Sequence, residues 1–355
     1  MRHFISLIAF GALAVSAWAS SDSYPIRGTF LNFYRDLKPA EWEVEFQAMQ
    51  DVGIETVVVS SVGRLRPDPG NPSRFNLSPE GLLFPSMLVS SRERPAHDRL
   101  EMILSLADRH GMRIYLGSLQ TAADWTGGTE FSALSLYNRL LASEILQRYG
   151  RHASLQGWYF TQEIWLNWVS YYGEDYYGTK LLATWVADMI ALDAAKATAA
   201  TMVFKKAAQG AMPGLIPPDV QKWTSHLSAQ TRIDILMPQD GIGAQAGAPS
   251  MEELAAYYRA MAAGVLASSA KTAIWSIVEE FNPLPGVDGS KYPPASAVRI
   301  KKQVDTVRPY VAGYVGWIFG DDMSPQATYY PAEAKELNRQ YRLLFDGTGL
   351  ISSSR

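Results

Sequence analysis

The segment Gly157-Trp-Tyr-Phe-Thr-Gln-Glu-Ile-Trp165 joins a short apolar and aromatic run to two polar side chains, Gln162 and Glu163. Aromatic residues favour strands, so the first half of the segment is typical of a buried strand. A carboxylate at the end of such a strand is costly to bury without a partner. The segment therefore predicts a strand whose tip presents an acid at a functional site.

Strand-like and helix-like runs alternate along the rest of the chain. Pro39 near the start of one helix and Gly53 at its end are favourable terminal residues, and Ser250 with Glu253 forms a capping box. The run 56–59 is β-branched and apolar on both faces, as a parallel strand covered by helices should be. The predicted strands are residues 28–33, 55–62, 112–120, 157–163, 199–204, 233–241, 272–280 and 311–320.

Eight strands that alternate with eight helices over residues 20–350 predict one domain, a (β/α)8 TIM barrel. An open doubly wound sheet is the alternative, but it requires a Gly-rich phosphate-binding turn that the sequence lacks. Six prolines in residues 63–95 predict a long loop after the second strand, on the side where a barrel carries its active site. Residues 351–355 are expected to be a disordered tail.

The composition excludes several classes of protein. Hydrophobic residues make up 47% of the 355 residues and charged residues 19%, so a large core can form. The net charge of -3 gives no reason to expect a nucleic-acid partner. The sequence contains no cysteine, its five histidines are scattered, and it lacks phosphate-loop and dinucleotide motifs. We therefore expect no metal site and no cofactor.

Residues 1–19 have the pattern of a secretory signal peptide. Arg2 and His3 precede an apolar run from Phe4 to Ser16, and Ala17-Trp-Ala19 is a small-x-small cleavage site. The apolar run is shorter than the roughly 20 residues that span a bilayer, although an uncleaved N-terminal anchor is the alternative. We expect cleavage after Ala19, a periplasmic or secreted bacterial protein, and no stable membrane insertion of the mature chain. The oligomeric state is left open.

Polar side chains collect where the predicted strands end, which is the edge of a barrel that carries the active site. Acids there can also cap the next helix. Capping suits Asp321 and Asp322 better than Glu163 and Glu279, which are not followed by a helix start. The polar and aromatic residues at the strand ends are Asn32, Tyr34, Gln120, Gln162, Glu163, Trp165, Gln239, Asp240, Glu279, Glu280, Trp317, Asp321 and Asp322.

The two neighbouring acids of the seventh strand lie on opposite faces. Residues of one face recur every two positions, so Glu279 shares a face with Trp275 and Ile277, whereas Glu280 shares one with Val278. Alternation alone does not show which face points into the barrel. The choice between Glu279 and Glu280 therefore stays open on this argument.

Four segments resemble a family of exported bacterial barrels known as a domain of unknown function with a glycoside-hydrolase-like fold. They are G-T-F-L-N-F at 28–33, G-W-Y-F-T-Q-E-I-W at 157–165, P-Q-D-G-I-G at 238–243 and W-S-I-V-E-E-F at 275–281. The resemblance extends over nearly the whole mature chain. It places the second acid at Glu279.

The order of the acids also resembles glycoside hydrolase clan A. That resemblance implies that Glu163, after the fourth strand, is the acid/base and that Glu279, after the seventh, is the nucleophile or base. Clan A has Asn before the first of these acids. This chain has Gln162 there, whose longer side chain is expected to donate the same hydrogen bond to the sugar 2-hydroxyl.

The chemistry of glycoside cleavage fits this arrangement, because it needs two carboxyl groups with different pKa values. Asp240 is a third candidate, either an acid that binds hydroxyl groups or a base on an inverting pathway. Tryptophan and tyrosine rings stack on the apolar faces of sugars, although many of them fill the core instead. The predicted substrate-binding residues are Tyr34, Gln120, Gln162, Trp165, Gln239, Asp240 and Trp317.

We therefore expect a secreted glycoside hydrolase that cleaves a polysaccharide or oligosaccharide. The alternative is a non-catalytic carbohydrate-binding or exopolysaccharide-assembly barrel. A metal-dependent hydrolase comes third, with ligands that would be almost all carboxylates because histidine is scarce. The sequence leaves open the sugar, the linkage, endo or exo action, and retention or inversion.

Overall fold

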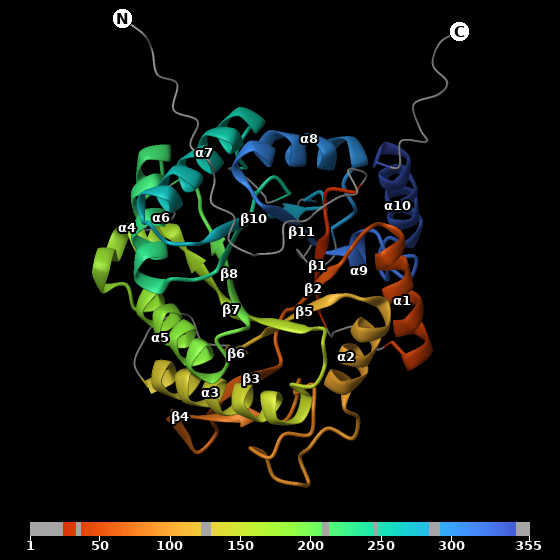
Figure 1. Ribbon diagram of the computed structural model, residues 1–355, viewed down its shortest axis with the longest axis vertical. Coiled ribbons are helices and arrows are strands. Elements are labelled where there is room, and N and C mark those ends of the chain that lie inside the picture. The colour runs from red at the N-terminus through yellow and green to blue at the C-terminus, as the bar shows by residue number, and fades with distance from the viewer. Residues whose placement is uncertain are drawn as a thin grey trace, which may run out of the picture.

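The computed structural model describes residues 24–32, 37–121, 129–207, 213–243, 248–283 and 292–345. Eight parallel strands close into a barrel in the order β1-β11-β10-β9-β8-β7-β5-β2, with helices around it (Figure 1). This confirms the predicted (β/α)8 TIM barrel. The barrel strands are β1 (Gly28–Leu31), β2 (Thr56–Val59), β5 (Arg113–Gly117), β7 (Leu155–Trp165), β8 (Ala197–Val203), β9 (Ile235–Pro238), β10 (Ala273–Glu279) and β11 (Gly313–Trp317).

The helices begin and end at residues that the sequence marks. Asp98 caps α2 by accepting a hydrogen bond from the backbone of Glu101, and the predicted capping box of Ser250 and Glu253 starts α7. The long helices are α1 (Pro39–Asp51), α2 (Arg99–His110), α3 (Thr129–Tyr149), α5 (Tyr177–Leu192), α6 (Pro217–Thr231), α7 (Met251–Ala267), α8 (Ala297–Val307) and α10 (Pro331–Phe345). Short ones are α4 (Leu166–Tyr172), η1 (Gly173–Asp175), η3 (Arg308–Tyr310) and α9 (Phe319–Asp322). In the described ranges no helix is long and apolar enough to cross a membrane.

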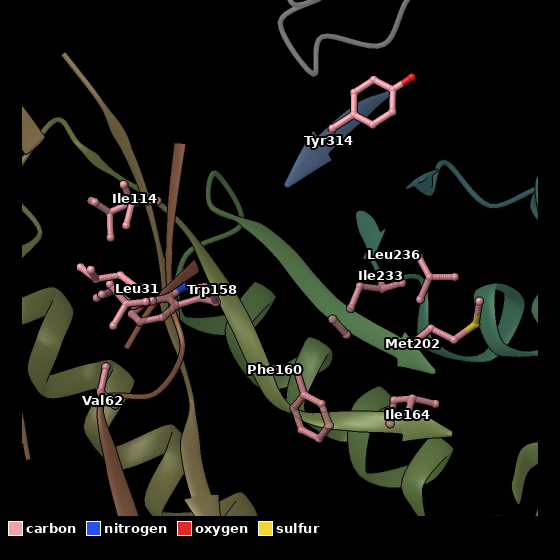
Figure 2. Packing of buried hydrophobic residues seen from close by; sticks show 14 of the residues in the cluster. Leu31, Val62, Ile114, Trp158, Phe160, Ile164, Met202, Ile233, Leu236 and Tyr314 are labelled. Carbon is pink, nitrogen blue, oxygen red and sulfur yellow. The ribbon is translucent and has the colours of Figure 1, made fainter. Parts of the chain in front are cut away.

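Two apolar layers hold the barrel together because strand residues point alternately inward and outward. In β7, for example, Tyr159 belongs to the inner cluster, and Trp158 and Phe160 belong to the outer one. The inner cluster comprises Phe30, Val58, Tyr115, Tyr159, Ala199, Ile235, Met237, Trp275, Ile277, Val315 and Ile318. Figure 2 shows part of the outer cluster, which lies between strands and helices, with Leu31, Val62, Ile114, Trp158, Phe160, Ile164, Met202, Ile233, Leu236 and Tyr314 labelled.

The segment after the second barrel strand differs from the predicted loop, because its first half is a hairpin. Strands β3 (Gly63–Asp68) and β4 (Asn71–Ser78) pair antiparallel, and β3 pairs in parallel with β6 (Leu119–Thr121). The prolines that favoured a loop are compatible with this sheet. The pairing with β6 covers residues 63–65 only, so Pro67 lies beyond it, where β3 is an edge strand and proline is tolerated.

Replacing Gly117 by Ala tests how closely β5 packs at the carboxyl end of the barrel. A side-chain carbon at Gly117 would lie 2.3 Å from the carbonyl oxygen of Ser60, and backbone atoms cannot move aside easily. We expect Gly117→Ala to lower the free energy of unfolding by about 1–3 kcal/mol in urea denaturation. Gly70→Ala is the control, since its nearest such contact is 3.4 Å away. Equal stability of the two variants would contradict the packing.

Candidate active site

Glu279 and Glu280 lie on opposite sides of the barrel wall. Trp275 and Ile277 belong to the inner cluster, and alternation therefore places Glu279 on the inner face of β10. Glu280 lies on the outer face and is 1% exposed. Its carboxylate packs so closely on Gly316 that a side-chain carbon there would lie 2.4 Å from Glu280 Oε1. Of the two acids, Glu279 is thus the one that faces the interior.

Glu163 is held at the tip of β7 by a neighbouring strand. Nε2 of Gln239, the residue directly after β9, donates a hydrogen bond of 2.7 Å to Glu163 Oε1. Both residues line two cavities, of about 700 Å³ and about 290 Å³, which we call the large cavity and the small cavity. Glu163 therefore lies between the two cavities, with its carboxylate oriented by Gln239.

Both predicted catalytic carboxylates line the small cavity. Glu163 and Glu279 contribute to its wall together with Asp240 and Trp165. The ammonium group of Lys205 packs over the ring of Trp165, with Nζ 5.0 Å from the ring centroid. Two acids from different strands thus face one space, which is the arrangement that acid–base chemistry on a bound substrate requires.

Asp240 lies behind Glu279 and supports it. It is 1% exposed, and its Oδ1 accepts hydrogen bonds from the backbone of Ile242 at 3.1 Å and of Glu279 at 3.4 Å. Its Oδ2 accepts from Gln303 Nε2 at 2.6 Å. Burial raises the pKa of Asp240 to about 6, while the hydrogen bond from Gln303 opposes the rise. Asp240 therefore supports the backbone of Glu279 and has little access to solvent.

Arg299 of α8 fixes the backbone of β10 from outside the barrel. Its Nη2 donates to the carbonyl oxygens of Glu279 at 2.9 Å and Phe281 at 2.7 Å. Burial lowers the pKa of Arg299, and the surrounding acids raise it. Burial and the nearby Asp322 carboxylate raise the pKa of Glu280 well above its ordinary value. A single guanidinium thus lies among the acids Asp240, Glu279, Glu280 and Asp322.

The other predicted site residues are divided between the two cavities. Gln120 and Trp317 line the large cavity, and the Trp317 ring packs on Phe30 with centroids 4.9 Å apart. The peptide bond between Trp317 and Ile318 is cis. Tyr34 lies outside the described residues.

The side-chain nitrogen of Gln162, predicted to donate a hydrogen bond to the sugar, donates to the protein backbone instead. Its Nε2 donates a hydrogen bond of 2.9 Å to the carbonyl oxygen of Leu119, which fixes the orientation of the amide. Its amide oxygen has no hydrogen-bond partner in the described part of the chain. Because Gln162 lines the large cavity, that oxygen is available to accept a hydrogen bond.

Sequence reasoning did not find Arg299 and Gln303, which support the site from α8. Their signal is weak. Gln303 lies in the same helical stripe as the buried Ile300 and Val307, so it is a polar residue on an apolar face. Asp322 is the last residue of α9 and has a structural role, because its Oδ2 accepts a hydrogen bond of 3.2 Å from the backbone of Ile318, the residue before that helix. Among the described residues, no group of three or more His, Asp or Glu side chains is arranged to hold a metal ion.

The raised pKa of Asp240 predicts the pH dependence of an Asp240→Asn variant. The ordinary pKa of 3.8 rises to about 6 on folding, so the contribution of Asp240 to wild-type stability falls by on the order of 2–3 kcal/mol as pH rises from about 4 to 6. The side chain of Asp240→Asn cannot ionise, so this fall in stability is absent from the variant. Gln303 can turn its amide, because its Oε1 has no hydrogen-bond partner in the described structure.

We therefore expect the stability of Asp240→Asn relative to wild type to increase between pH 4 and 6 and to level off above pH 6. Urea unfolding at several pH values measures it. Asp175→Asn is the control, since that side chain is 95% exposed. A difference between Asp240→Asn and wild type that does not change with pH would contradict the assignment.

Solved structures of sugar-cleaving enzymes have similar folds at low sequence identity. A protein from Bacteroides thetaiotaomicron VPI-5482 described as a "putative alpha-L-fucosidase" has a TM-score of 0.74 and 19% identity, with 97% of this chain and 99% of that chain covered. The endo-1,4-beta-mannanase from Rhizomucor miehei has a TM-score of 0.58 and 11% identity, covering 92% and 95%. A glucosidase from Croceicoccus marinus has a TM-score of 0.58 and 10% identity, covering 91% and 66%. At these identities the likeness shows the fold alone.

The sequence itself places the chain in a family. No protein with a curated description matches it. The family pattern of a domain of unknown function, DUF4434, matches residues 26–329, and the structure is the glycoside-hydrolase-like TIM barrel that the resemblance implied. Since the match covers most of the chain, this protein belongs to the DUF4434 family.

Proposed function

We propose that this protein is a glycoside hydrolase that cleaves a polysaccharide or oligosaccharide, with Glu163 as acid/base and Glu279 as nucleophile or base. The observation that carries the proposal is that both carboxylates line the small cavity. They come from the carboxyl ends of β7 and β10, which two strands separate in the barrel. A glycosidic bond in that cavity would therefore have an acid on each side.

Each carboxylate has support that suits its proposed role. The N–H donor of Gln239 fixes Glu163 between the two cavities, where Glu163 would protonate the leaving oxygen. Glu279 would attack the anomeric carbon or activate a water molecule, and Asp240 and Arg299 hold its backbone in place. We assign Asp240 to positioning rather than to contact with the sugar, because it is 1% exposed and its oxygens already accept hydrogen bonds.

The aromatic and amide residues would bind the sugar. Trp165 in the small cavity and Trp317 in the large cavity offer ring faces for stacking. Gln162 would accept a hydrogen bond from a sugar hydroxyl through its amide oxygen, since its nitrogen is bound to Leu119. The mannanase, glucosidase and fucosidase descriptions of the structural neighbours agree with a carbohydrate substrate. We also propose export, on the signal-peptide pattern of residues 1–19.

Loss of either carboxylate should abolish hydrolysis without unfolding the protein. The wild type is screened for release of reducing ends from mannan, xylan, β-glucan, fucosylated and acidic glycans. On any glycan cleaved, Glu163→Gln and Glu279→Gln should each lower kcat/KM by at least about 10³-fold. Glu252→Gln, an exposed acid at the start of α7, is the control and should retain activity. Wild-type-like activity of both site variants would contradict the proposal.

A substrate with an activated leaving group separates the two roles. A dinitrophenyl glycoside of the sugar identified in the screen leaves without protonation, so it does not need an acid. Glu163→Gln should therefore recover much of the rate of bond cleavage on this substrate, measured as dinitrophenolate released in the first turnover, whereas Glu279→Gln should not. Recovery by Glu279→Gln alone would show that the roles are reversed.

A further inference from the structure

The hairpin after the second barrel strand forms a basic wall of the large cavity. Arg64 and Arg66 lie two positions apart on β3, so they share a face, and both line the cavity. Leu65 between them points the other way and is fully buried. The same cavity includes Glu163. The two arginines and the proposed acid/base thus face one continuous space.

The two arginines differ in how their charges are compensated. Arg66 forms an ion pair of 2.6 Å with Glu80, which also lines the cavity. Arg64 instead donates from Nη2 to the neutral amide oxygen of Gln120 at 3.1 Å. No carboxylate of the described chain forms an ion pair with Arg64. Gln120 therefore orients the guanidinium, and no ion pair within the described residues compensates its positive charge.

We propose that Arg64 binds the carboxylate of an acidic sugar, a uronic acid residue, in the large cavity. This inference rests on the proposed function and adds the substrate class. A guanidinium has five N–H donors in a planar fork that matches a carboxylate, and Gln120 uses one nitrogen of that fork. An ionised ligand carboxylate here pairs with the opposite charge of the guanidinium and can accept two parallel hydrogen bonds, whereas a neutral sugar hydroxyl brings no charge to the contact. The ion pair of Arg66 and Glu80 borders the subsite without adding net charge.

The pairing of strands gives this subsite a fixed geometry. Arg64 lies directly opposite Gln120 in the parallel register of β3 and β6. Gln162, beside Glu163, is bound through Leu119 to the same strand β6. The Arg64 guanidinium and the proposed catalytic acid are therefore held by one connected framework. A uronate on Arg64 would lie on the large-cavity side of the bond that is cleaved.

Binding to the full-length inactive variant Glu279→Gln tests the subsite independently of hydrolysis. The probes are tetrasaccharides of alginate, polygalacturonate and hyaluronan, their carboxyl-reduced neutral counterparts, and a sulfated carrageenan tetrasaccharide, all titrated by calorimetry to millimolar concentration. We expect at least one uronate probe to bind about tenfold or more tightly than its reduced counterpart. Adding Arg64→Gln should reduce the ratio of the two dissociation constants, reduced probe to uronate probe, to less than about two. Arg64→Lys should keep part of the preference for the uronate probe.

Arg342→Gln on α10 is the control for the loss of one positive charge and should leave the ratio unchanged. The affinity of the neutral probes separates binding from folding, because a variant that merely disturbed the hairpin would weaken the acidic and neutral members of each pair alike. The proposal is overturned if the uronate and the reduced member of each pair bind equally, or if no uronate probe binds. It is also overturned if the preference for the uronate persists in Arg64→Gln, or if only the sulfated probe is preferred.

The two proposals fail in different ways. Cleavage of a neutral glycan that depends on Glu163 and Glu279, with no preference for uronates, would keep the hydrolase and remove the acidic subsite. Uronate binding that depends on Arg64, in a protein that cleaves no glycan of the screen, would keep the subsite and indicate a binding barrel.

Discussion

The closed barrel imposes one constraint on every strand, the alternation of side chains between the inside and the outside of the wall. Along β10 this alternation sends Trp275 and Ile277 into the inner core and Val278 into the layer beneath the helices. At the end of the strand the same alternation places two consecutive acids on opposite sides of the wall. Glu279 faces the small cavity, and Glu280 is packed against Gly316 on the outer side. A register shift of one residue would exchange them.

Placing several acids near the tip of one strand carries an electrostatic cost, which α8 reduces. Arg299 is partly buried among four carboxylates and donates to two carbonyl oxygens of the chain at the end of β10. Gln303, one turn further on, bonds to Asp240. Burial raises the pKa values of Asp240 and Glu280, so protonation also relieves the repulsion. These residues need not touch a substrate to matter, because they decide where Glu279 lies.

The hairpin β3-β4 gives the site its second side. The barrel supplies the acids. A three-stranded sheet that is separate from the barrel supplies Arg64 and Arg66 to the same cavity, and the turn after β4 supplies Glu80. In the proposed function, the barrel would hold the reacting groups, while a segment outside it would present side chains that select the sugar.

The sequence by itself determined the barrel and the positions of its strand-end residues. These features are local and periodic: a β-branched run such as 56–59, a capping box at Ser250, and polar residues such as Gln239 and Glu163 directly after apolar runs. Only the tertiary structure decided which acid faces inward, that Gln239 orients Glu163 across 76 positions, and that Pro67 lies within a strand. The reason is physical. Local patterns fix what one segment can form, whereas contacts between distant segments depend on how the barrel closes.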